Sequence, residues 1–78
     1  MGRFEYDKLR GRIREVYGTQ AGFAKAIGLS VTSVSKKLNN DVDWKQEEIA
    51  KAVEALGLQG TDIHAYFFVK KVEKNTTG

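Results

Sequence analysis

Four side chains near the middle of the chain are suited to reading the edges of DNA base pairs: Val31, Thr32, Ser35 and Lys36. A lysine ammonium can donate to O6 and N7 of guanine, and the two hydroxyls can each donate or accept a hydrogen bond. The valine can pack on the methyl group of thymine, which carries sequence information without a hydrogen bond. This chemistry requires one element that presents all four side chains on the same side.

The segment 19–38 has the pattern of two short helices joined by a tight turn. Apolar residues recur at helical spacing in both halves, at Phe23, Ala24 and Ile27 and then at Val34 and Leu38. Thr19 and Ser30 can each accept a backbone N–H at a helix start, and Gly28 stands where a left-handed residue often ends a helix. With the apolar face turned inward, the four candidate side chains lie on the exposed side of the second helix. The pattern predicts a DNA-binding helix-turn-helix.

The spacing of three residues in this segment is characteristic of one family. Counted from Gln20, the fifth, ninth and fifteenth residues are Ala24, Gly28 and Val34. This arrangement resembles the helix-turn-helix of phage lambda-type repressors and Cro proteins, in which a small residue lets the helices approach, a glycine makes the turn and a branched residue locks the pair. The sequence departs from that family at Lys37, where an apolar residue is usual.

The resemblance implies a short Cro-type regulator of a phage or prophage, which binds operator DNA and represses transcription. Gln20, Lys37 and Asn39 are then expected at backbone phosphates, and the residues of the second helix at base edges. The candidate DNA-binding residues are Gln20, Val31, Thr32, Ser33, Ser35, Lys36, Lys37 and Asn39. The expected partner is double-stranded DNA with a pseudo-palindromic operator, bound by a homodimer whose half-sites lie about 34 Å apart.

Charge is divided unevenly along the chain. Residues 1–40 hold eight Lys/Arg and three Asp/Glu, a net charge of +5, whereas residues 41–78 hold five Lys and seven Asp/Glu, a net charge of −2. A basic half that coincides with the helix-turn-helix suits a surface that faces phosphates. The alternative is an ordinary solvated surface. Asp41 and Asp43 would be repelled by phosphate, so their loop is expected to lie away from the DNA backbone.

The remaining sequence predicts helices on both sides of the motif. A first helix is expected from an N-cap at Asp7 to about residue 17, where Gly18 ends it. A strong helical pattern follows Trp44, and a cap at Lys45 with Glu48 three residues on is favoured over a cap at Asp43. In the favoured version Trp44 and Ile49 form a hydrophobic staple, which makes the tryptophan a lid on the core.

Thr61 can open a last short helix, and the residues beyond it, 68–74, have strand character. The four bulky residues 66–69 fit either the domain's own core or a dimer contact. The whole sequence therefore predicts an all-α, five-helix, lambda-repressor-like domain over residues 1–78. Its helices 2 and 3 form the helix-turn-helix, residues 1–6 an N-terminal arm and residues 75–78 a frayed tail.

Other classes of protein are disfavoured by composition. The chain has no cysteine and a single histidine, His64, and it lacks a glycine-rich phosphate loop and metal-ligand spacing. We therefore expect no enzyme activity, no cofactor, no metal and no small-molecule substrate. No apolar run approaches the roughly 20 residues of a membrane helix. No membrane partner is expected, and the cytoplasm of the host cell is the expected location.

Two further functions stay open. The helix-turn-helix can serve as a protein-interaction module without specific DNA reading, since a fold does not by itself determine a function. Such a module should expose apolar residues on its second helix: Val31 fits this reading, whereas Ser35 and Lys36 favour a hydrated surface. RNA binding ranks third, because no aromatic platform is expected near the motif.

Overall fold

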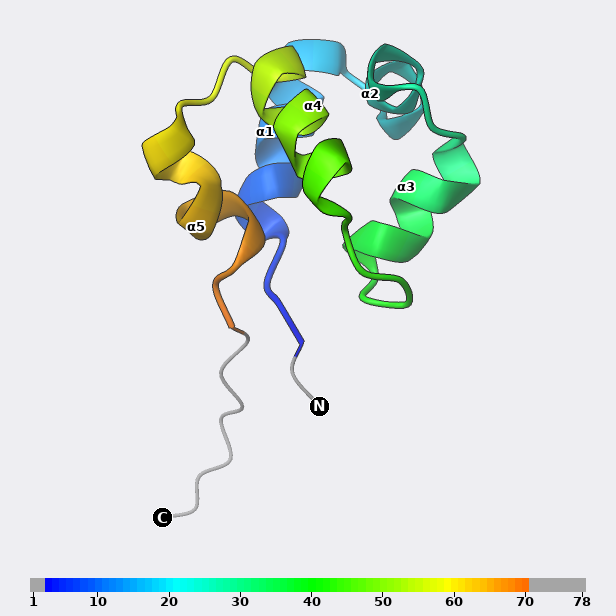
Figure 1. Cartoon of the computed structure of the whole chain (residues 1–78). Helices are drawn as coiled ribbons and strands as arrows, with labels where there is room; N and C mark the ends of the chain where they lie inside the picture. The colour runs from blue at the N-terminus through cyan, green and yellow to red at the C-terminus, as the bar shows by residue number, and fades with distance from the viewer. Residues whose placement is uncertain (1–2, 71–78) are drawn as a thin grey trace.

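A computed structural model of the protein describes residues 3–70 and folds them into five α-helices. The helices are α1 (Asp7–Tyr17), α2 (Gln20–Ile27), α3 (Val31–Leu38), α4 (Gln46–Ala55) and α5 (Ile63–Phe67). In Figure 1, α2 and α3 lie on one side of α1 and α4, and α5 lies on the other side. The all-α, five-helix prediction is confirmed, with helices 2 and 3 as the helix-turn-helix.

Apolar residues from all five helices form one core. Its buried members are Tyr6, Leu9, Ile13, Phe23, Ala24, Ile27, Val34, Leu38, Ile49, Ala52, Leu56 and Phe67. The two faces predicted for segment 19–38 are among them, so the helical spacing located the core correctly. Trp44 packs edge-on against Phe67, with ring centroids 5.3 Å apart, as expected for a lid on the core.

The ends of α2 and α3 follow local sequence signals. Thr19 Oγ1 accepts the N–H of Gly22 at 3.0 Å, and Ser30 Oγ accepts the N–H of Ser33 at 3.1 Å. Gly28 is left-handed at φ +78°, a conformation that is sterically unfavourable for a residue with a Cβ. The Glu48 carboxylate accepts the N–H of Lys45 at 2.8 Å, which confirms the predicted start of α4.

Two predicted helix starts are wrong by one or two residues. The N-cap of α1 is Tyr6 and makes no side-chain cap, so Asp7 is the first helical residue and lies in the first turn, where its charge favours the helix dipole. Thr61 lies inside a 3-10 turn at Gly60–Asp62, and α5 begins after it at Ile63. The Asp62 carboxylate accepts the N–H of Gln59 at 3.0 Å and thereby sets this turn.

The predicted N-terminal arm is wrong from Phe4 onward, because this segment is bound to the domain. Phe4 donates its N–H to Asn40 Oδ1 at 3.0 Å and accepts from Asn40 Nδ2 at 2.9 Å. Glu5 donates to the Val69 carbonyl at 2.7 Å, and Phe4 forms an isolated antiparallel bridge with Lys70. Figure 1 shows the two segments side by side below α1 and α5. The predicted strand character of 71–74 and the tail at 75–78 lie outside the described residues.

Candidate functional site

Helix α3 presents the predicted base-reading residues together. Val34 and Leu38 are buried, which turns Val31, Thr32, Ser35 and Lys36 outward as one surface, the α3 face. Val31 is 45% exposed, Thr32 and Lys36 are exposed, and Ser35 is half-buried. Ser33 is also half-buried and donates its backbone N–H to the N-cap Ser30. The α3 face is thus small and polar, with one valine and one lysine.

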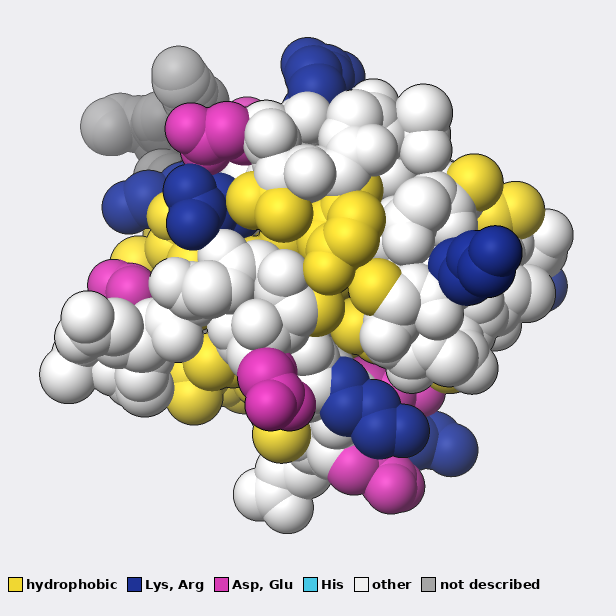
Figure 2. Space-filling view, turned by 90° about the horizontal axis from the view of Figure 1, so that it is seen from above, with side chains coloured by type: hydrophobic (Ala, Val, Ile, Leu, Met, Phe, Trp, Pro, Cys, Tyr) yellow, Lys and Arg dark blue, Asp and Glu magenta, His cyan; other side chains and the backbone are white. Residues whose placement is uncertain are grey.

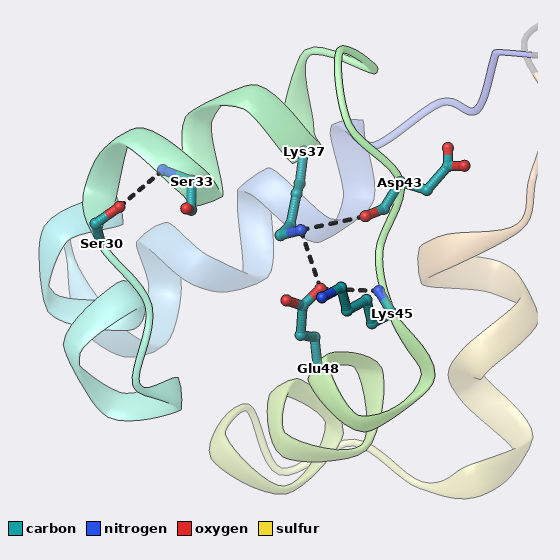
Figure 3. A network of polar contacts seen from close by, with 6 residues as sticks. All are labelled: Ser30, Ser33, Lys37, Asp43, Lys45 and Glu48. Atoms are coloured by element: carbon teal, nitrogen blue, oxygen red, sulfur yellow. Dashed lines mark hydrogen bonds and ion pairs between the residues drawn. The ribbon is translucent and has the colours of Figure 1, made fainter.

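Lys37 is not a surface residue. Its exposed fraction is 4%, its Nζ lies 3.0 Å from Glu48 Oε1, and it donates to the Asp43 carbonyl at 3.2 Å. Figure 3 shows the ammonium between these two partners. The side chain fills a place that is usually apolar in lambda-type repressors, and a buried ammonium needs a counter-charge there. The expectation that Lys37 reaches a phosphate is therefore corrected.

The environment of Glu48 favours its charged form. Burial disfavours the carboxylate, but the hydrogen bonds from the Lys45 N–H and the Lys37 ammonium, with the charges of both lysines, hold the pKa of Glu48 below its ordinary value. Glu48 is the partner that sequence reasoning missed. The signal was Lys37 itself, because a lysine at a position that should be buried calls for an acid nearby.

Asn39 and Arg10 form a second polar tie at the end of α3. The Arg10 guanidinium donates to the Leu38 carbonyl at 3.0 Å and to Asn39 Oδ1 at 2.9 Å. A cation at a helix C-terminus interacts favourably with the helix dipole. Asn39, expected at a phosphate, therefore accepts a hydrogen bond from α1 through its amide oxygen. Arg10 uses its Nη2 group for these two hydrogen bonds within the domain.

Gln20 stands at the start of α2, beside the α3 face. A groove between the end of α1 and the starts of α2 and α3 is lined by Gln20, Val31, Arg10 and Arg14, among others. Arg14 is exposed and Gln20 is half-buried. The structure therefore brings Gln20 and Val31 together in a groove that the exposed Arg14 also lines.

The loop after α3 changes the charge of this surface. Asp41, Val42 and Asp43 are all exposed, and Val42 is 45% exposed. Residues 31–43 hold two lysines and two aspartates. Because Lys37 is neutralised by Glu48, the exposed charges that these residues keep are one lysine and two aspartates. The basic half predicted from the sequence does not extend over α3 and its loop.

A different surface lies at the far end of α1. Figure 2 shows apolar side chains at the centre of the face seen from above, with basic and acidic side chains around them. Val16 of α1 is 43% exposed, and a groove beside Tyr17 is lined by Ala26, Lys51 and Ala55, among others. Within residues 3–70, no cluster of His, Asp or Glu could hold a metal ion, and no helix is long and apolar enough to cross a membrane.

Together, the fold and the α3 face define a small helix-turn-helix protein whose helix α3 exposes one lysine. The chain belongs to the family described as "Protein of unknown function (DUF739)", whose model matches residues 2–70. It is similar to the modulator of repression (MOR) of the temperate bacteriophage TP901-1 from Lactococcus lactis, known from a solution structure. The two are 52% identical, with a TM-score of 0.74, over 83% of this chain and 88% of that one.

These relations place the chain among small phage regulatory proteins, and they do not single out the Cro type. No curated protein matches the chain at a significant level.

Proposed function

We propose that this protein modulates phage repression by binding a protein of the repression system, the phage repressor, through the α3 face. The observation that carries the proposal is the similarity to the modulator of repression of phage TP901-1, at 52% identity over 83% of this chain. Modulation of repression is the activity that the other protein's name states. A repressor is the component on which such an activity acts most directly.

The chemistry of the α3 face supports a protein partner. Val31 offers an apolar contact at 45% exposure, and the two hydroxyls beside it offer adaptable hydrogen bonds. DNA binding draws much of its free energy from Lys and Arg at phosphates. Here Glu48 neutralises the charge of Lys37, and Asp41 and Asp43 add exposed negative charge next to the helix. Such a surface gains little from a phosphate backbone, whereas its exposed valine and hydroxyl groups suit contact with a protein surface.

Sequence-specific binding of double-stranded DNA is the second candidate function. It is favoured by the helix-turn-helix itself and by Thr32, Ser35 and Lys36 on the exposed side of its second helix. Exposed Arg14, near Gln20, offers a phosphate contact. In this reading the protein is a homodimer that represses transcription at a pseudo-palindromic operator.

A pair of matched valine variants tests the proposed function. Val31→Glu places a carboxylate on the α3 face, whereas Val16→Glu makes the same change on α1 at nearly equal exposure, 45% against 43%. The probe is the purified repressor encoded in the same genome, titrated by calorimetry. We expect Val31→Glu to weaken binding at least about tenfold, since an interface carboxylate without a partner costs more than 1.4 kcal/mol. Val16→Glu should bind like the wild type.

Two results would contradict the proposal. If the two variants bound the repressor equally well, the α3 face would not be the binding surface. If the wild type ignored the repressor and bound an inverted-repeat operator in preference to random duplex, the second candidate function would replace the first. Thermal unfolding of both variants provides the control for folding.

A further inference from the structure

Lys37 and Glu48 form an ion pair where an apolar contact would serve stability. The side chains are 6% and 13% exposed, with Nζ and Oε1 3.0 Å apart. Removing two charges from water is costly, and apolar residues of similar volume often stabilise a fold as well as a buried ion pair does. The stability of the core alone therefore gives no reason for this pair, and its geometry suggests another role.

The pair connects three segments at one point. Lys37 lies in the last turn of α3, Asp43 in the loop, and Glu48 in the first turn of α4. Besides the ammonium, Glu48 Oε1 also accepts the Lys45 N–H at 2.8 Å, so one carboxylate holds both the helix start and the end of α3 (Figure 3). These bonds are directional and fix distances, whereas an apolar contact tolerates sliding.

The rest of α3 has fewer ties to α4. Helix α3 packs chiefly against α2, and at its end Arg10 of α1 binds the Leu38 carbonyl. In the described part of the chain, the hydrogen-bonded tie between α3 and α4 is the one that Lys37 makes. This tie lies on the side of α3 away from Val31 and Lys36, and so it can orient the α3 face without touching a partner.

We infer that Lys37 and Glu48 are a positioning pair that sets the orientation of α3 and the shape of the 39–45 loop required for binding the repressor. The inference rests on the proposed function, because it assigns a role to residues behind the same surface. The pair contributes no atom to the interface. Its effect reaches the partner through the angle of α3 and through the position of the exposed Val42.

The test is a double variant that removes both charges. Lys37→Met/Glu48→Gln keeps similar volumes and keeps an acceptor for the Lys45 N–H, but it removes the ammonium that binds Asp43. Lys51→Met/Glu54→Gln makes the same change of charge at exposed positions of α4 and is the matched control. The measurements are repressor affinity, thermal unfolding and the amide chemical shifts of α3 and residues 39–45.

We expect the Lys37→Met/Glu48→Gln variant to stay folded, to shift the amides of residues 39–45 and to bind the repressor about tenfold more weakly, a loss of about 1.4 kcal/mol. The Lys51→Met/Glu54→Gln control should bind like the wild type. A milder variant, Glu48→Asp, keeps both charges and shortens the carboxylate by one methylene. Glu48→Asp should also weaken repressor binding. It tests the positioning role if the double variant fails to fold.

Binding at wild-type affinity by either folded variant would overturn the positioning role and leave the proposed function intact. Failure of the wild type itself to bind the repressor would refute the proposed function, and this inference with it.

Discussion

The buried ion pair predicts an asymmetry between two single substitutions. Lys37→Met leaves the Glu48 carboxylate with 13% exposure and a hydrogen bond from the Lys45 N–H. Glu48→Gln leaves the Lys37 ammonium with 6% exposure and with neutral acceptors, the Asp43 carbonyl and the new amide oxygen, in place of a carboxylate. Breaking a buried pair costs about 3–5 kcal/mol when the remaining charge has no compensation. The remaining carboxylate is better compensated than the remaining ammonium.

We therefore expect Glu48→Gln to lower the free energy of unfolding by about 3 kcal/mol and Lys37→Met by about 1–2 kcal/mol. The Lys37→Met/Glu48→Gln variant should lose less than the sum of the two, with a coupling energy of about 1–3 kcal/mol. Urea unfolding at pH 7 followed by circular dichroism measures all four proteins. A larger loss for Lys37→Met, or strictly additive losses, would refute the assignment of a coupled, buried pair.

Two further predictions concern stability. The pKa of Glu48 is below its ordinary value of about 4.5, so the ionised carboxylate stabilises the fold above that pH. This stabilisation is lost as the pH falls through the folded-state pKa. Urea unfolding from pH 7 to pH 3 should therefore show a shrinking difference in the free energy of unfolding between wild type and Glu48→Gln, and a constant difference would contradict this. Asn40→Gly keeps the positive φ of 65° but removes both hydrogen bonds to Phe4, which together form a clamp between the two segments. We expect the free energy of unfolding to fall by about 1–2 kcal/mol and amide exchange at Phe4 to become faster. Unchanged exchange at Phe4 would contradict this role of the clamp.

Much of the fold could be predicted because its signals are local. Thr19, Ser30 and Gly28 act within a few residues of their own positions, so the ends of α2 and α3 are visible in the sequence. The apolar spacing of the same segment places its core face. The start of α1 was misplaced at Asp7, because Tyr6 holds the cap position without a side-chain bond and leaves no signal.

Long-range pairings could not be read from the sequence. Asn40 binds Phe4 across 36 residues, and this clamp turns the expected arm into part of the domain. Lys37 and Glu48 come from different helices, and their pairing depends on how α3 and α4 approach. The exposure of the α3 face was predicted correctly, but the burial of Lys37 behind it was not, because a count of lysines does not say which of them are neutralised.

The kind of partner follows from that charge. With Lys37 counted as exposed, the helix-turn-helix belongs to a basic half of the chain and DNA is the natural partner. With Lys37 buried against Glu48, residues 31–43 expose one lysine and two aspartates. This difference, together with the similarity to a modulator of repression, moves the preferred partner from DNA to protein.

The most direct test of the partner compares repressor binding with DNA binding at near-physiological salt. The wild-type protein is titrated with the purified repressor of its own genome and, in parallel, with a random pool of duplex DNA from which bound sites are selected. We expect a saturable complex with the repressor, weakened by Val31→Glu but not by Val16→Glu, and no enriched DNA site. An enriched inverted repeat without repressor binding would contradict this expectation.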